Sequence, residues 1–215
     1  IHYVSRLSDE YKVSGDSFYT QDGKNVLPLG TLTALETKAP NGYLLDGAYM
    51  QANGSEEQIK GMYLTQITED GDIAVLSGSN QYHVSDKVIH GGVKIQKRDL
   101  ETSDTKGQGS ATLKDAEFEI TSLNDNAVLV EGKLYSKNEV VKTILTDIEG
   151  VASTSADLLP YGKYRIEESK APEGYLTDGA EPIEFEITED GKIVDLTGAD
   201  TSIYNQVKRG DLEGV

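Results

Sequence analysis

Three polar side chains in the second half of the chain stand where the neighbouring sequence predicts apolar ones. Side chains two positions apart point to the same face of a β-strand. In the expected strand Val93–Lys97, the lysine therefore shares a face with Val93 and Ile95. The other two cases are Glu168, which follows Tyr164 and Ile166, and Asn205, which stands between Ile203 and Val207. Because burying an unpaired polar group is costly, three groups of complementary chemistry predict a shared site.

The chemistry that these three side chains can perform is the formation of a covalent crosslink. A desolvated lysine loses its proton more easily, and its neutral amine is a nucleophile. A buried glutamate tends to hold a proton, so it can polarise the carboxamide carbonyl and pass a proton to departing ammonia. Lys97, Glu168 and Asn205 would then yield an Nζ–Cγ isopeptide bond. The alternative is a buried Lys–Glu ion pair with a hydrogen-bonded asparagine, or side chains that reach solvent at strand ends.

The elements that must position this trio are short strands. Runs with a period of two residues, separated by Gly, Asp, Asn and Pro, are typical of an antiparallel sandwich or barrel. No stretch shows sustained helical periodicity. The expected strands of the second half are Val93–Lys97, Ala116–Ile120, Lys133–Tyr135, Val140–Leu145, Tyr164–Glu168, Ile183–Ile187 and Ile203–Val207.

The segment that begins with Glu168 occurs twice. Glu168–Tyr175 reads ESKAPEGY, and Glu36–Tyr43 reads ETKAPNGY. Two copies more than 100 positions apart predict tandem domains rather than a solenoid. Gly91-Gly92 is the expected hinge between them. The first copy carries an insertion within residues 48–66, where residues 54–60 are expected to form a helical turn or a surface loop.

Composition excludes several classes of function. The chain has no cysteine, so disulfides, thiolate metal sites and cysteine nucleophiles are excluded. Its formal charge of -17 argues against nucleic acids and anionic membranes as partners. We expect no cofactor and no metal, because the histidines are not spaced as ligands and the acidic loop 99–104 lacks EF-hand spacing. No run is long and apolar enough to insert into a membrane.

Four motifs together carry a family resemblance. They are Val93-Lys-Ile-Gln-Lys97-Arg-Asp, Leu113-Lys-Asp-Ala-Glu-Phe118, Gly162-Lys-Tyr-Arg-Ile-Glu-Glu168-Ser-Lys-Ala-Pro-Glu-Gly-Tyr175 and Ile203-Tyr-Asn205. This combination resembles the Cna B-type domains of Gram-positive pilins and surface adhesins, which are transthyretin-like, inverse-immunoglobulin β-sandwiches. In that family a first-strand lysine and a last-strand Asn or Asp form a spontaneous isopeptide bond. The resemblance implies that Lys97 is the nucleophile, Asn205 the electrophile and Glu168 the proton-transfer catalyst.

The first half of the chain matches the family less completely. Glu36 occupies the catalytic place, and Asp86 takes the place of Asn205, counted back from the glycine that follows each. An aspartate acceptor would lose water rather than ammonia. A strand equivalent to Val93–Lys97, with its lysine, is missing from the residues shown, so we expect no intact bond in this half.

These observations predict an all-β chain of tandem antiparallel sandwiches. We expect a Cna B-type domain lacking its first strand over residues 1–90 and a complete one over residues 91–207. Residues 208–215 are expected to be a linker or the start of a following repeat. They include Arg209-Gly-Asp211, which spells an integrin-recognition tripeptide, although a simple linker glycine is the favoured interpretation.

The resemblance implies a fragment of a Gram-positive surface protein, extracellular and anchored to the cell wall outside this fragment. Its expected function is that of a stalk or pilin-like shaft whose partners are adjacent domains of the same protein. It would not be an enzyme beyond a single-turnover self-crosslinking. Two alternatives remain: a module that binds a host matrix protein or glycan, and an accessory domain of a secreted enzyme.

Overall fold

The computed structural model describes residues 19–26, 29–35, 38–44, 49–51, 58–60, 62–70, 86–177 and 180–211. These residues form strands and connecting turns, with one short 3-10 helix at Ala199–Thr201, which confirms the all-β class. The chain divides into two compact units: Ile1–Ala39 with Leu44–Lys87, and Pro40–Tyr43 with Val88–Val215. No helix in the described ranges is long and apolar enough to cross a membrane. The tandem arrangement of two like domains stays a prediction.

The described strands of the first unit form three antiparallel pairs. The pairs are β1 (Tyr19–Gln21) with β2 (Lys24–Val26), β3 (Gly30–Leu35) with β7 (Met62–Ile67), and β5 (Tyr49–Gln51) with β6 (Gln58–Lys60). β4 (Tyr43–Leu44) pairs with β8 (Lys87–Val88), and each of these two strands contains one residue of either unit. The expected helical turn or loop over residues 54–60 is therefore wrong at its C-terminal end, because residues 58–60 find strand partners in β5.

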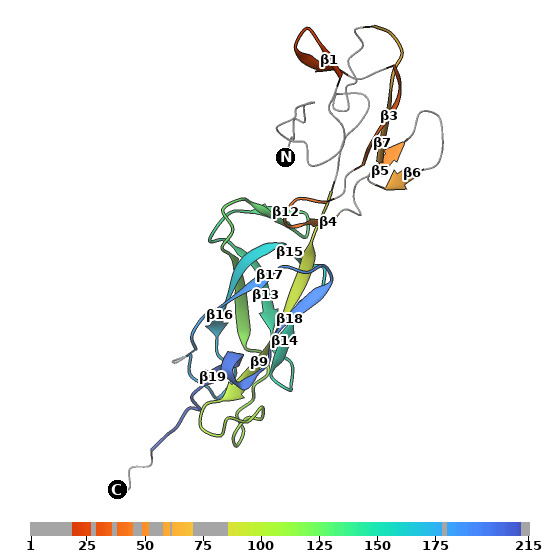
Figure 1. Cartoon of the computed structure of the whole chain (residues 1–215). Helices are drawn as coiled ribbons and strands as arrows, with labels where there is room; N and C mark the ends of the chain where they lie inside the picture. Colours follow the sequence, from red (N-terminus) through yellow and green to blue (C-terminus); the bar gives the residue numbers. More distant parts are fainter. Residues whose placement is uncertain are drawn as a thin grey trace. The chain divides into compact units, whose positions relative to one another are not determined.

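One sheet of the second unit is built around β9 (His90–Asp99), shown in yellow-green in Figure 1. β14 (Val151–Ser153) and β15 (Leu159–Pro160) pair antiparallel with one edge of β9. β18 (Lys192–Leu196) and β19 (Ile203–Asn205) follow each other in parallel along the other edge. Because β9 has neighbours on both edges, most of its residues are buried.

The second sheet of this unit has the order β13 (Val140–Leu145), β10 (Glu117–Ser122), β16 (Gly162–Lys170) and β17 (Ile183–Ile187), all antiparallel. A separate hairpin is formed by β11 (Val128–Val130) and β12 (Lys133–Tyr135). Alternate side chains of both sheets meet in one apolar core, as period-two burial requires. Its members include Val93, Ile95, Phe118, Ile120, Tyr164, Ile166, Phe185, Ile187 and Ile203.

Gly91 and Gly92 are not a hinge. Both lie inside β9 and are buried. A Cβ atom on Gly92 would lie 2.3 Å from the backbone oxygen of Ser155, and one on Gly91 would lie 2.8 Å from that of Lys192. These glycines are therefore required by close backbone approach rather than by flexibility.

The final strand is also shorter than predicted. β19 ends at Asn205, and Val207 instead forms an isolated bridge with Tyr175. Four strands were not predicted from the sequence: β11, β14, β15 and β18. Three of them are only two or three residues long and so show little periodicity.

Candidate functional site

The three polar residues singled out in the sequence come from three different strands. Lys97 lies on β9, Asn205 on β19 and Glu168 on β16. In the parallel ladder of β9 and β19, Lys97 is the partner of Ile203, and Asp99 is the partner of Asn205. Partners in a ladder share a face, so the lysine and the asparagine both point into the core from one sheet.

Glu168 reaches the same place from the opposite sheet. It is the ladder partner of Phe118 on β10, while the next pair along is Lys170 with Glu117. Ser169 is thus an extra residue in β16, and this bulge ends the inward alternation immediately after Glu168. The aromatic ring of Phe118 adjoins the lysine, with Nζ 5.8 Å from the ring centroid, within the range of a cation–π contact.

The polar atoms of the trio are in close contact and are removed from water. Nζ of Lys97 lies 3.1 Å from Oε1 of Glu168, and both side chains are 0 % exposed. Nδ2 of Asn205 donates a hydrogen bond of 2.7 Å to Oε2 of Glu168. The glutamate therefore contacts both the amine and the carboxamide. The structure brings the predicted trio together, although the chemical roles of its members stay predictions.

The hydrogen bonding of the trio is incomplete. Nζ of Lys97, Oε1 of Glu168 and Oδ1 of Asn205 are buried, and none of them has a well-aligned hydrogen bond within the described part of the chain. The Lys97–Glu168 contact is short enough for an ion pair but poorly directed for a hydrogen bond. Buried polar atoms are nearly always satisfied in folded proteins. An exception of three atoms in one cluster therefore sets this part of the core apart.

The environment of Lys97 favours its nucleophilic form. Burial lowers the pKa of its amine from 10.5 to about 8, although the negative charge of the adjacent Glu168 acts in the opposite direction. Removing the ammonium from water disfavours the charged state more than one carboxylate restores it. The amine is therefore far more readily deprotonated than that of an exposed lysine.

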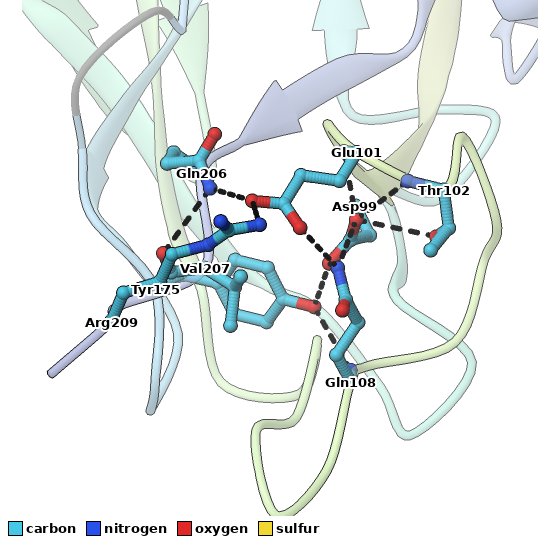
Figure 2. A network of polar contacts seen from close by, with 8 residues as sticks. All are labelled: Asp99, Glu101, Thr102, Gln108, Tyr175, Gln206, Val207 and Arg209. Atoms are coloured by element: carbon cyan, nitrogen blue, oxygen red, sulfur yellow. Dashed lines mark hydrogen bonds and ion pairs between the residues drawn. The ribbon is translucent and has the colours of Figure 1, made fainter. Parts of the chain in front are cut away.

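A second polar cluster, which was not predicted from the sequence, adjoins the trio. Asp99, which the sequence assigned to a polar loop, is the last residue of β9 and is 0 % exposed. Its carboxylate accepts hydrogen bonds from the hydroxyl of Tyr175 at 2.7 Å and from the Nε2 atom of Gln108 at 3.0 Å. The backbone amides of Glu101 and Thr102 donate to the same carboxylate, each at 2.9 Å. Figure 2 shows this network.

The two titratable members of this cluster have opposite pKa shifts. Burial alone would raise the pKa of Asp99, but the hydrogen bonds from Thr102, Tyr175, Gln108 and Glu101 outweigh it and lower the pKa to about 2. Burial and the bond to Asp99 raise the pKa of Tyr175 to about 12. The donor thus keeps its proton and the acceptor its charge over the whole physiological range. The period of two in the sequence could have predicted this burial, because Asp99 stands two residues after Lys97 and so continues its inward face.

The residues proposed for the first half are only partly described. Glu36 lies outside the described residues. Asp86 is described: its Oδ1 atom is buried and lacks a hydrogen-bond partner within the described ranges. No group of three or more metal-ligating side chains occurs in the part of the chain that the structure describes.

The family described as the SpaA prealbumin-like fold domain matches residues 91–202, which is more than half of the chain. The chain therefore belongs to this family, and the resemblance to Cna B-type pilin domains is confirmed. The matched region is a structural domain of the pilin type. No curated protein sequence matches the chain.

One solved structure, the first described below, agrees with this assignment of fold. The TIE protein of Bacillus anthracis is 25% identical, with a TM-score of 0.51, over 84% of this chain and 26% of its own. The major pilin subunit BcpA of Bacillus cereus is 26% identical, with a TM-score of 0.37, over 58% of this chain and 32% of its own. This chain thus spans about a quarter to a third of these two proteins.

Proposed function

We propose that this chain is a shaft segment of a Gram-positive surface protein of the pilin or adhesin type, stiffened by an isopeptide bond between Lys97 and Asn205. The observation that carries the proposal is the dry, incompletely hydrogen-bonded contact of these two side chains with Glu168. Family membership supports the structural role and an extracellular location, with neighbouring domains of the same protein as partners. The chemistry is a single self-directed turnover rather than enzymatic catalysis.

The first step is a proton transfer within the ion pair. Nζ of Lys97 and Oε1 of Glu168 are 3.1 Å apart in a core from which water is excluded. An isolated ion pair is poorly stabilised in such surroundings. Movement of one proton from nitrogen to oxygen yields a neutral amine and a carboxylic acid, which are easier to bury. The low pKa of Lys97 supports this step.

The second step exchanges one C–N bond for another. The amine lone pair attacks Cγ of Asn205, while the acid of Glu168 stabilises the oxyanion that develops on Oδ1. The bond from Cγ to Nδ2 then breaks, and Nδ2 leaves as ammonia after it takes a proton. Oε2 of Glu168 already contacts Nδ2, so the same carboxyl group can deliver that proton.

Every proton of the lysine ammonium is accounted for in the products. The lysine ammonium begins with three protons on nitrogen, and the product amide keeps one. Of the other two, one leaves with the ammonia, and the second remains on Glu168 or departs as part of an ammonium ion. No oxidant, metal or cofactor is required.

The bond would have a mechanical consequence, because it joins the strand that begins the domain to the strand that ends it. β19 contributes only three residues to its ladder with β9, so backbone hydrogen bonding alone gives a weak connection. A covalent link transmits tension between the two strands without loading the rest of the sandwich. By analogy with disulfides that close loops of this length, it would also stabilise the fold by ~5 kcal/mol.

We propose the corresponding roles of catalyst for Glu36 and acceptor for Asp86 in a first domain over residues 1–90. Two backbone hydrogen bonds support the equivalence: the amide of Ile89 donates to the oxygen of Gly42, as that of Lys208 donates to Gly174. Asp86 stands three residues before Ile89, as Asn205 stands three before Lys208. The second domain would cover residues 91–207, with a linker after it.

The intact mass of the purified chain tests the proposal. We expect the wild type to be lighter than its sequence mass by one ammonia, and Lys97→Met and Glu168→Gln to show the full sequence mass. Lys94→Met is the matched control, because Lys94 lies on the same strand but outside the inward face. A wild type at full mass would overturn the proposed bond, and an additional loss of one water would assign a second bond to Asp86.

A further inference from the structure

The reacting side chains lie on three segments that are far apart in the sequence, so their alignment must come from contacts around them. β19 is the least supported of the three. Among the described strands it pairs only with β9, over three residues. Bond formation requires that Nζ approach Cγ of Asn205 to about 3–3.5 Å, and a misplacement of 1 Å can slow such a reaction ~10²-fold.

We infer that Asp99 and Tyr175 are positioning residues for the crosslinking reaction, because their hydrogen bond ties together the three segments that carry the reacting side chains. This inference rests on the proposed isopeptide bond. Neither residue is assigned a role in the proton transfers. Their contribution is to hold the segments at the spacing that the reaction needs.

The first connection is between β9 and the segment that follows Glu168. Asp99 stands two residues after Lys97 on the same inward face of β9. Tyr175 is the last residue of the repeated octapeptide that begins with Glu168. Its hydroxyl donates a hydrogen bond of 2.7 Å to Oδ2 of Asp99. Both side chains are essentially unexposed, at 0 % and 1 %. One buried hydrogen bond thus joins the neighbourhoods of the amine and of the carboxyl group.

The second connection is between Tyr175 and the segment that carries Asn205. Tyr175 forms a β-bridge with Val207, two residues after the asparagine. The next backbone amide, of Leu176, donates to the oxygen of Gln206 at 2.9 Å, and the amide of Lys208 donates to Gly174 at 2.7 Å. The turn at Tyr175 is therefore bonded to the chain immediately after the electrophile.

The third connection joins β9 directly to the end of β19. The amide of Leu100, next to Asp99, donates to the backbone oxygen of Asn205 at 2.9 Å. Next to this bond, the carboxylate of Glu101 accepts hydrogen bonds from the side-chain amides of Gln108 at 3.1 Å and of Gln206. The same carboxylate forms an ion pair with Arg209. Figure 2 shows Glu101, Gln108, Gln206 and Arg209 around Asp99 and Tyr175.

The character of the cluster fits positioning rather than ligand binding. The carboxylate of Asp99 is saturated by donors of the chain itself: the Tyr175 hydroxyl, the Gln108 amide, two backbone amides and the Thr102 hydroxyl. In the neighbouring trio, by contrast, three buried atoms lack aligned partners. One cluster is fully hydrogen-bonded, and it adjoins one whose hydrogen bonding is incomplete.

Tyr175→Phe tests the inference, with Tyr164→Phe as the matched control. Each variant removes one hydroxyl from a buried tyrosine of the same domain. The two are matched because the hydroxyl of Tyr164 also donates a hydrogen bond, to the backbone oxygen of Pro160 at 2.8 Å. The full chain is made by cell-free synthesis, quenched at intervals, and the loss of ammonia is followed by intact mass. We expect Tyr175→Phe to slow this first-order step by about tenfold or more, and Tyr164→Phe to change it by less than about twofold.

Two further measurements separate positioning from stability. The unfolding midpoint of each variant is determined on the Lys97→Met background, which cannot crosslink, so that rates are compared at known stability. The double variant Asp99→Asn with Tyr175→Phe should react no more slowly than the slower single variant, because both changes break one shared bond.

Equal slowing by the two tyrosine variants, or a rate that follows the unfolding midpoint, would overturn the inference. Unchanged rates in both variants would overturn it as well. A wild type that never loses ammonia would instead overturn the proposed bond, and the positioning role with it. The wild-type time course alone therefore tells the two failures apart.

Discussion

Nζ of Lys97 lies 3.1 Å from Oε1 of Glu168 in a part of the core where neither side chain is exposed. This arrangement is an expensive way to stabilise a sandwich, because burying two charges costs about as much as their attraction returns. The contact has a function if Lys97 and Glu168 take part in a reaction. Once Lys97 becomes an amide, the buried positive charge no longer exists, and the proposed reaction removes the cost that the contact imposes.

Replacing Glu168 by glutamine should abolish the crosslink and destabilise the domain. The variant leaves a buried ammonium without a counter-charge and without a proton acceptor, a change that typically costs about 3–5 kcal/mol, in addition to the ~5 kcal/mol lost with the crosslink. Glu167→Gln is the control, since that carboxylate is half-exposed beside Arg165 and should have little effect. Intact mass and urea unfolding measure the two outcomes. A crosslinked Glu168→Gln protein would remove the glutamate from the mechanism.

Replacing Asn205 by aspartate should change the leaving group from ammonia to water. The crosslinked variant and the crosslinked wild type would then have identical masses, although their sequence masses differ. We expect the variant to react more slowly, because its carboxyl group must share a proton with Glu168 where Nδ2 now donates a 2.7 Å hydrogen bond. High-resolution intact mass over time checks this. Different final masses for the two proteins would contradict the assignment of Asn205 as the electrophile.

The lowered pKa of Lys97 predicts a stability that rises with pH in the uncrosslinked protein. Between about pH 8 and pH 10.5 the unfolded lysine still binds a proton that the folded one has released. The unfolded state therefore binds more protons, and the free energy of unfolding rises with pH across this window by up to about 3 kcal/mol.

Asn205→Ala, which lacks the electrophile, is the protein in which to measure this rise. The double variant Lys97→Met with Asn205→Ala is its control, and the difference between the two unfolding curves isolates the lysine. A difference that stays constant from pH 8 to pH 10 would show that the folded amine titrates like an exposed one.

Adding a methyl group at Gly92 should destabilise the second unit by about 1–3 kcal/mol or more. The new Cβ would lie 2.3 Å from the backbone oxygen of Ser155, which cannot move aside as a flexible side chain would. Gly210→Ala is the matched control, because the Cβ atom that it adds would have no described neighbour within 4 Å. Thermal unfolding compares them. Equal unfolding midpoints for the two variants would contradict the close packing of Gly92 and favour the expected hinge at Gly91-Gly92.

Much of the fold and of the reactive trio could be predicted because the period of two along a strand is a local property. It placed Lys97, Glu168 and Asn205 on inward faces, and the structure buries all three. The same rule applied one step further along β9 would have placed Asp99 inside. Asp99 was instead assigned to a loop, because it begins a polar stretch that has the composition of one.

The sequence by itself thus determined the all-β class, the family and the identities of the three groups that meet in the core. Only the tertiary structure decided how they meet: β19 lies parallel to β9 with Asn205 beside Asp99, and Glu168 crosses from the opposite sheet. It also revealed the hydrogen bond between Tyr175 and Asp99. The physical reason is that alternation within a strand depends on neighbouring residues, whereas register and facing between strands depend on contacts between segments remote in the chain.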